Sequence, residues 1–395
     1  MNTNEHGGTS EPFDITPGQA EVIFLHTAVA DLSMPISIRY LLRGNVDPEA
    51  MIRALTVLVD SNETLRVKFE RDGESVRQRV MDRVSEPNII ARDVGSASVS
   101  EMMRYSTLLL RTDAISWNIW SGPPYRFHLI RNDAGVYLLL LTFQHSVVNA
   151  RSVSRMETEL FRAYAAVDAA PATREPRLRS AIEAQRQSSA ASASAAAYWS
   201  ETMRELANST VAPRVGVEHR SVGVRLHTAV SASVDGRNRM DRPAAALSCY
   251  ADFLGQGRTG TLDRVAVDMH FEHHTSRYRD VAGMFSVQRP VVIDRSPHGA
   301  NRRAVADRIM ETMRHKAVDS ALLRNLADEH QVTRENFADF NYVHSEPTGE
   351  LAQPLGLEVE RSWFTPRHLS TRPARLQVKD YGTSASVVLT WNPDM

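Results

Sequence analysis

The chain has 395 residues, of which 42% are hydrophobic and 24% charged, and 46 basic against 47 acidic side chains give a formal net charge of −1. This is the balance of a globular protein with room for about two domains. The near neutrality argues against the strongly basic surface of a nucleic-acid-binding domain, so no nucleic-acid partner is predicted. The single cysteine, Cys249, excludes an internal disulfide and a cysteine-based zinc cluster, which makes a cytoplasmic location the default prediction.

The sequence shows no targeting or membrane segment. Residues 1–13 are polar and predict a flexible N-terminal tail, without the charged and apolar regions of a signal peptide. The longest apolar run, residues 136–143, is too short to cross a bilayer. No membrane partner is therefore predicted.

The first half of the chain alternates helices and strands. A helix is expected after Thr16-Pro17, where threonine can cap and proline fits the first turn, and a strand is expected at 35–43. Asp47-Pro48 opens a helix whose apolar residues recur at intervals of three and four. A strand at 65–70 then leads through an Asp-Gly turn into another strand.

Further along, a helix near 98–111 precedes two strands, 124–130 and 136–143, which predict a hairpin. Residues 144–152 leave the second strand and lead into a helix. Residues 169–196 contain two prolines and a Ser/Ala-rich run, and they predict a linker whose second half could be helical.

The second half repeats this style without detectable sequence repetition. Helices are expected at about 196–207 and 241–255, with a long helical stretch at 299–329, and Cys249 is expected to be a buried small side chain in the second of them. Strands are expected at 222–234, 263–274, 284–294, 337–345, 357–364, 374–380 and 386–392. The mixture predicts an α/β or α+β sandwich pair, with one lobe at 14–168 and the other at 197–395.

The segment that draws attention is Gln-His-Ser-Val-Val-Asn-Ala at 144–150, between a buried strand and a helix. Taken alone, a histidine there is more often an ordinary hydrogen-bonded residue than a base. However, the segment resembles the HHxxxDG motif of the condensation domains of non-ribosomal peptide synthetases, which have the chloramphenicol-acetyltransferase-like fold. Other segments resemble family motifs in the same order: TPGQA (16–20), LLRGNVDPEAMIRAL (41–55), NETLRVKFE (62–70), WSGPPYRFHLI (120–130, with Arg126 kept), Tyr198-Trp199, VAGMFSVQRPVVID (281–294) and NFADFNYVHS (336–345).

The resemblance implies two acetyltransferase-like lobes arranged as a V-shaped pseudo-dimer, with the active site at their interface. It implies an acyltransferase of natural-product or antibiotic biosynthesis that forms an amide or ester bond. The donor would be an acyl thioester on the phosphopantetheine arm of an acyl or peptidyl carrier protein, and the acceptor an amine or alcohol. No tightly bound cofactor and no metal are implied. The family's functional histidine corresponds to His145, which suits proton removal and stabilisation of the tetrahedral intermediate.

The sequence departs from the family motif at several positions. Gln144 replaces the first histidine, Asn149 the aspartate and Ala150 the glycine, and Asn62 stands where an upstream motif has histidine. Gln144, Asn149, Ala150 and Arg126 are expected to support the shape of the His145 loop. Two alternatives stay open: an enzyme of the same fold turned to cyclisation or another reaction of a bound intermediate, and a catalytically retired scaffold that binds carrier proteins.

A second group of polar residues lies in the other half. His270, Glu272 and His274 alternate along a predicted strand and therefore share one face. A metal site is the least favoured explanation of this pattern, and a polar face open to solvent is the simplest. The functional alternative is that His270 and His274, with Ser286 and Gln288 of the next strand, line the substrate tunnel.

Overall fold

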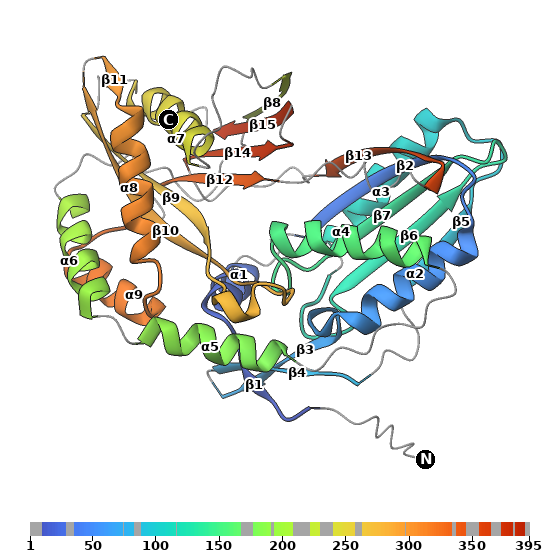
Figure 1. The fold of residues 1–395 in the computed structure, drawn as a ribbon, viewed down its shortest axis with the longest axis horizontal. Helices are drawn as coiled ribbons and strands as arrows, with labels where there is room; N and C mark the ends of the chain where they lie inside the picture. Colours follow the sequence, from blue (N-terminus) through green and yellow to red (C-terminus); the bar gives the residue numbers. More distant parts are fainter. Residues whose placement is uncertain are drawn as a thin grey trace. The chain divides into compact units, whose positions relative to one another are not determined.

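The computed structural model describes residues 10–28, 35–73, 75–82, 88–115, 117–166, 177–190, 193–207, 222–229, 240–256, 263–296, 298–333, 337–344, 355–364, 373–381 and 384–391. Helices and strands are interspersed along the chain, and the predicted mixed α/β fold is confirmed (Figure 1). The chain divides into two compact units. The first holds residues 1–183, 276–285 and 347–367, and the second holds residues 184–275, 286–346 and 368–395.

The first unit is built on a five-stranded sheet with the order β13-β2-β7-β6-β5, in which only β5 and β6 are parallel. The strands are β2 (Ile36–Gly44), β5 (Ile89–Asp93), β6 (Tyr125–Arg131), β7 (Tyr137–Phe143) and β13 (Leu357–Phe364). β6 and β7 form the predicted hairpin. The edge strand β13 comes from near the C-terminus, an exchange that nothing in the local sequence pattern indicates.

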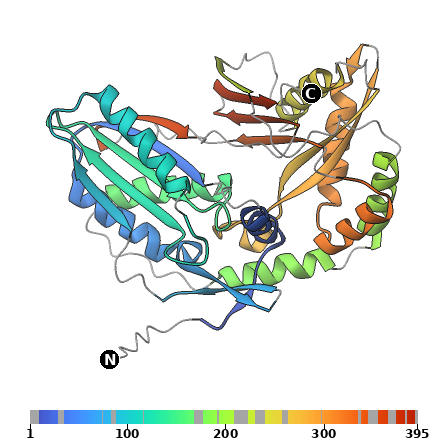
Figure 2. The ribbon, with the colours of Figure 1, turned by 180° about the vertical axis from the view of Figure 1, so that it is seen from behind.

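Helices cover both faces of this sheet. α2 (Pro48–Ser61) and α4 (Ala150–Ala165) lie on one face and α3 (Val99–Ile115) on the other, as the two opposite views show (Figures 1 and 2). Every residue of β7 is buried because the strand is central and covered on both sides. That explains why its sequence is continuously apolar rather than alternating.

A small antiparallel sheet completes the first unit, with the order β1-β4-β3. Its strands are β1 (Phe13–Asp14), β3 (Val67–Asp72) and β4 (Ser75–Val80). The next helix, α1 (Pro17–Ala28), begins with a reciprocal capping box: the Gln19 N–H donates to Thr16 Oγ1 at 2.9 Å, and the Thr16 N–H donates to Gln19 Oε1 at 2.8 Å. The predicted cap at Thr16 is confirmed.

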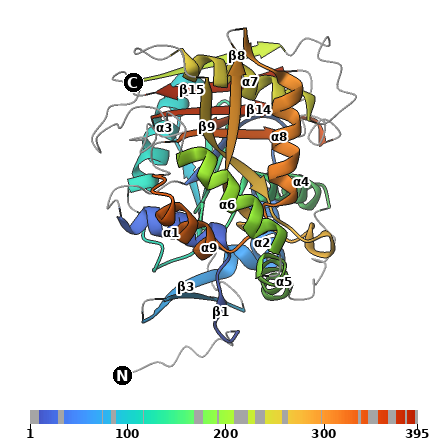
Figure 3. The same cartoon turned by 90° about the vertical axis from the view of Figure 1, so that its left-hand side faces the viewer.

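The second unit is built on a seven-stranded sheet with the order β11-β10-β9-β12-β14-β15-β8. Its strands are β8 (Val222–Ala229), β9 (Arg264–Glu272), β10 (Ser286–Ser296), β11 (Gly299–Ala300), β12 (Ala338–His344), β14 (Ala374–Asp380) and β15 (Ser384–Trp391). α7 (Asp241–Gly255) and α8 (Arg302–Arg314) pack together on one face, and α8 runs along the sheet in Figure 3. The remaining helices are α6 (Ala193–Ala207) and α9 (Ser320–Glu329).

Three expectations are corrected. The stretch 299–329 is not one helix: α8 ends at Arg314, and a new helix begins where the Asp319 carboxylate accepts a hydrogen bond from the Ala321 N–H at 2.8 Å. The strand expected from residue 65 begins at Val67, after a 3₁₀ turn, η1 (Glu63–Arg66). Cys249 is exposed, because the buried stripe of α7 lies on the opposite side of the helix.

The predicted linker is largely helical where it is described. Residues 169–176 lie outside the described residues, whereas α5 (Leu178–Ala190) and the start of α6 occupy most of the rest. The described part of the Ser/Ala-rich run therefore supplies small residues to two helices.

Candidate functional site

The loop that carries the altered motif, residues 144–149, is fixed at both ends. The Gln144 N–H donates to the Pro124 carbonyl at 2.9 Å, and the Val147 N–H turns back to the Gln144 carbonyl at 3.1 Å. Val147 and Val148 are fully buried in the core between the sheet and its helices. Their burial anchors the loop. The backbone at His145, which lies between β7 and these two valines, is therefore held in place.

His145 is oriented by its own loop. Its Nδ1 lies 3.2 Å from the Val148 carbonyl oxygen, and a carbonyl can only accept a hydrogen bond. The neutral ring therefore carries its hydrogen on Nδ1 and keeps the lone pair on Nε2. The side chain is half-buried, and Nε2 is the ring nitrogen whose lone pair could accept a proton.

Gln144 ties the loop to its neighbours instead of titrating. Its amide nitrogen lies 3.4 Å from the Asn118 carbonyl, and its amide oxygen accepts from the Ser146 hydroxyl, also at 3.4 Å. The side chain is buried. Glutamine thus holds the segment 117–120 with hydrogen bonds, and it does so at any pH because an amide does not ionise.

Asn149 is the N-cap of α4. Its backbone is extended, and its side-chain oxygen accepts from the Ser152 N–H at 2.9 Å. Asparagine and aspartate are about equally good caps, which explains how the motif keeps its helix without the carboxylate. Ala150 is the first residue of α4 and has ordinary helical geometry, so its methyl group requires no left-handed backbone.

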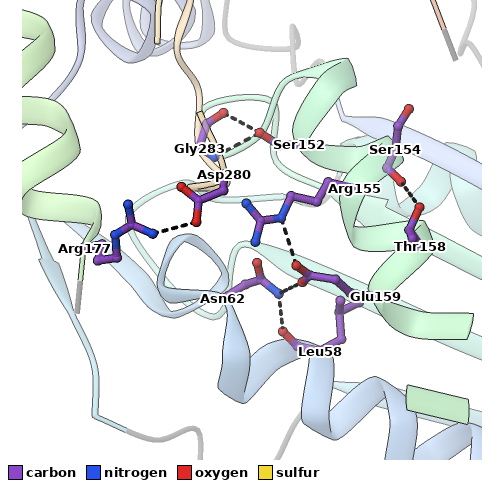
Figure 4. Close-up of polar contacts among 10 residues, drawn as sticks. All are labelled: Leu58, Asn62, Ser152, Ser154, Arg155, Thr158, Glu159, Arg177, Asp280 and Gly283. Carbon is purple, nitrogen blue, oxygen red and sulfur yellow. Dashed lines mark hydrogen bonds and ion pairs between the residues drawn. The ribbon is translucent and has the colours of Figure 1, made fainter. Parts of the chain in front are cut away.

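A second layer of contacts surrounds the loop and α4. The Thr64 hydroxyl donates to the Val147 carbonyl at 2.5 Å. Asn62, where the family has histidine, donates from its amide nitrogen to the Leu58 carbonyl at 2.9 Å and to Glu159 Oε2 at 3.0 Å (Figure 4). Asn62 therefore joins the end of α2 to α4 and acts as a structural link.

The segment 276–285 also belongs to this region of the first unit. The Ser152 hydroxyl donates to the Gly283 carbonyl at 2.8 Å and accepts from the Gly283 N–H at 3.0 Å (Figure 4). Arg177 pairs with Asp280 at 2.6 Å, and the Thr16 hydroxyl donates to the Met284 carbonyl at 2.6 Å. Sequence reasoning did not select Ser152 or Gly283 as site residues. The sequence offered two clues to them. Ser152 is three residues beyond the N-cap Asn149, and Gly283 lies in the segment 281–294 that resembles a family motif.

Arg126 lies on β6, where its cross-strand partner is Thr142 of β7. Its guanidinium is 2.5 Å from Asp113 Oδ1, and His128 Nε2 is 2.9 Å from Asp113 Oδ2. Burial acts to raise the pKa of Asp113, but the hydrogen bonds from His128 and Arg126 outweigh it, so the pKa lies below its usual value. The ionised carboxylate therefore joins α3 to β6, the first strand of the hairpin that leads to the His145 loop.

The four residues predicted to line a tunnel lie together in the second unit. On neighbouring strands His270 is directly opposite Gln288, and Glu272 is directly opposite Ser286. Both pairs are in hydrogen-bond contact, at 2.9 Å for the first and 3.2 Å for the second. His274 Nδ1 lies 2.9 Å from Glu272 Oε2.

Two further residues of this face were not selected from the sequence. His270 Nε2 lies 3.0 Å from Asp339 Oδ1, and Arg375 Nε lies 2.9 Å from Asp339 Oδ2. The available signal was Asp339 itself, an acidic residue flanked by Ala338 and Phe340 in a predicted strand. Within the part of the chain that is described, no group of three His, Cys, Asp or Glu side chains is placed to hold a metal ion.

The architecture and the strand–loop–helix placement of His145 define a chain of the condensation type. The Condensation domain family model matches residues 30–345, so the chain belongs to this family. Its sequence is 29% identical to cyclosporin synthetase of Tolypocladium inflatum over 161 residues, and 30% identical to bassianolide nonribosomal cyclodepsipeptide synthetase of Beauveria bassiana over 135 residues. These matches cover 40% and 34% of this chain but only 1% and 4% of those much longer synthetases.

Solved structures agree on the fold. A mutant starter condensation domain of rhizomide synthetase, in complex with C8-CoA and Leu-SNAC, matches with a TM-score of 0.77 at 16% identity, over 97% of this chain and 89% of that one. The first condensation domain of the calcium-dependent antibiotic synthetase matches with a TM-score of 0.77 at 15% identity, over 98% and 92%. The family in general catalyses amide or ester bond formation on carrier-bound substrates. None of the described helices is long and apolar enough to cross a membrane.

Proposed function

We propose that this protein is an acyltransferase of non-ribosomal peptide or related natural-product biosynthesis. It transfers an acyl group from a carrier-protein thioester to an amine or alcohol and forms an amide or ester. The observation that carries the proposal is the orientation of His145: its Nδ1 lies 3.2 Å from the Val148 carbonyl oxygen, so the neutral ring carries its hydrogen on Nδ1 and its proton-accepting lone pair on Nε2.

The chemistry follows from that tautomer. Nε2 of His145 accepts the proton of the attacking N–H or O–H group while the nucleophile bonds to the thioester carbonyl carbon. The tetrahedral intermediate then collapses, the C–S bond breaks, and the imidazolium returns its proton to the departing thiolate. A positioned general base contributes about 10²–10⁴-fold to such a step.

Gln144 and Asn149, which replace the histidine and aspartate of the family motif, are compatible with an active loop. Each has a structural role although its side chain does not ionise. Gln144 holds Asn118, and Asn149 caps α4. Neither role requires a charge. The base itself is retained, and it is the only member of the motif that the reaction requires to titrate.

The proposed partners follow from the reaction. An acyl or peptidyl carrier protein would deliver the donor on its phosphopantetheine arm, and a small-molecule or carrier-bound amine or alcohol would be the acceptor. No tightly bound cofactor enters the scheme. The complex of the rhizomide synthetase domain with C8-CoA and Leu-SNAC supports these partners. The two names denote an acyl group and an amino acid that are each attached to a thiol carrier.

The test is a reconstitution with loaded carrier proteins, followed by intact-mass spectrometry. Wild type should form product, and His145→Ala should lose at least about 10²-fold in rate. His344→Gln, which changes an exposed histidine of the second unit, is the matched control. Equal rates for all three would remove His145 as the base. Binding of carriers without product from any of them would favour a scaffold.

A further inference from the structure

Three consecutive side chains at the start of η1 reach three different parts of the first unit. Asn62 reaches α4 through Glu159 (Figure 4). Glu63 reaches the start of α5, and Thr64 reaches the His145 loop. Successive side chains of a 3₁₀ turn point about 120° apart, so a short turn of this kind can join several elements at one place.

The neighbours of Thr64 hold the turn in position. Glu63 Oε2 accepts hydrogen bonds from the backbone N–H groups of Arg177 and Leu178, at 2.6 and 2.8 Å. The carboxylate thus caps the first turn of α5, where the N–H groups have no partner within the helix. Leu65, on the other side, is fully buried in the core. The backbone on both sides of Thr64 is therefore anchored.

The Thr64 hydroxyl supports a carbonyl that water cannot reach. It donates to the Val147 carbonyl at 2.5 Å. Thr64 is 1% exposed, and Val147 and Val148 are 0% exposed. Without the hydroxyl this carbonyl would lose a buried donor that solvent cannot replace, which favours a rotation of its peptide group toward another partner.

Such a rotation would act on the group that orients His145. The ring Nδ1 lies 3.2 Å from the Val148 carbonyl oxygen, one residue beyond the carbonyl that Thr64 supports. The two peptide groups share the Cα atom of Val148, so a movement of the first displaces the second. Thr64 itself is too deeply buried to touch a substrate, and its influence passes through the loop.

We propose that Thr64 is a positioning residue, whose hydroxyl keeps the Val147–Val148 backbone in the geometry that leaves the hydrogen of the His145 ring on Nδ1 and its lone pair on Nε2. The use of that lone pair in acyl transfer rests on the proposed function, whereas the orientation of the ring does not. A displacement of a reacting group by about 1 Å can cost about 10²-fold in rate.

Kinetics with loaded carrier proteins test the role. Thr64→Val keeps the shape and removes the hydroxyl, so its kcat should fall by about 10- to 10²-fold while KM stays unchanged. Thr64→Ser should recover most of the rate, and Thr64→Cys, with a weaker donor, should be intermediate. Thr56→Val is the matched control, because it removes a hydroxyl bond to the Ile52 carbonyl within α2, at 3.0 Å, and it should match wild type. A wild-type kcat in Thr64→Val, or no recovery in Thr64→Ser, would overturn the proposal.

Nitrogen NMR of the His145 ring provides a readout without turnover. The neutral ring should carry its hydrogen on Nδ1 in wild type, Thr64→Ser and Thr56→Val, and the share of rings protonated on Nε2 should rise in Thr64→Val and less in Thr64→Cys. An unchanged share in both hydroxyl-free variants would overturn the role of Thr64 and leave the acyltransferase function standing. A wild-type protein that forms no product from any loaded carrier would overturn the acyltransferase function, and the NMR measurement would still decide the role of Thr64.

Discussion

A buried ion pair fastens the C-terminal edge strand to the motif helix, and its removal is the sharpest test of how the first unit is held together. Glu157 of α4 accepts hydrogen bonds from Arg361 of β13, at 2.5 Å, and from the hydroxyl of Tyr40 on β2. The Glu157 and Arg361 side chains are only 4% and 8% exposed. The perturbation is Arg361→Met, which keeps the apolar stem and removes the charge.

The magnitude follows from what remains after the substitution. Glu157 is left as a buried carboxylate that has lost its cationic partner Arg361 and keeps the hydrogen bond from Tyr40. The pKa of Tyr40 is raised well above its usual value, chiefly by burial and then by Glu157. Removing one member of a buried pair costs about 3–5 kcal/mol, whereas replacing all members by apolar groups of similar volume is often neutral. Arg361→Met should therefore destabilise the first unit by about 3–5 kcal/mol, a factor of more than about 100 in its folding equilibrium.

Urea unfolding and hydrogen exchange provide the assay. Trp363 lies next to the pair, with the Arg361 guanidinium 5.0 Å from its ring, so its fluorescence reports on β13. Peptides of β13 and β2 should lose exchange protection in Arg361→Met. The matched control is the triple variant Tyr40→Phe, Glu157→Leu and Arg361→Met, which removes these three buried polar groups together and should return to within about 1–2 kcal/mol of wild type.

Two results would refute the reasoning. A loss below about 1 kcal/mol in Arg361→Met would mean that Glu157 is well solvated despite its burial. A triple variant as unstable as the single variant would mean that the pair contributes through packing rather than through charge.

Four other predictions concern single residues. Burial, and then neighbouring cations, lower the pKa of His273 from 6.5 to about 4, so it stays neutral in the folded protein while it protonates in the unfolded chain. About 3 kcal/mol of the free energy of unfolding, present above pH 6.5, should be lost as the pH falls to 4; His273→Gln should flatten this slope in urea titrations, and an unchanged slope would contradict the assignment. Asn149→Ala should cost about 1 kcal/mol through loss of the α4 cap, and Asn149→Asp much less; equal losses in urea unfolding would argue against capping. A methyl group at Gly283 would lie 2.4 Å from the buried Phe285 ring, so Gly283→Ala should cost about 1–3 kcal/mol, and an unshifted unfolding midpoint would be inconsistent with this packing. Cys249 is exposed and should react with a maleimide in native buffer without a change in thermal midpoint; reaction only in denaturant would show that it is buried.

Local sequence determined most of the helices and strands. The capping residues Thr16 and Asp47 mark the helix starts that the structure shows, and the apolar run at 136–143 contains the buried strand β7. These features depend on neighbours only a few residues away, so periodicity and capping rules can read them. The family resemblance, carried by short motifs in order, predicted the mixed α/β fold, which is confirmed, and a functional role for His145, which stays a prediction.

Tertiary structure decided the contacts between residues far apart in the chain. The sequence contains no local sign that β13 pairs with β2, that Ser152 is bonded to Gly283, or that Asp339 holds His270. Each contact joins positions separated by dozens to hundreds of residues, and strand pairing over such distances follows from how the whole sheet closes. The same reason accounts for Cys249: an apolar helix predicts that one face is buried, but only the packing of α7 decided which face that is.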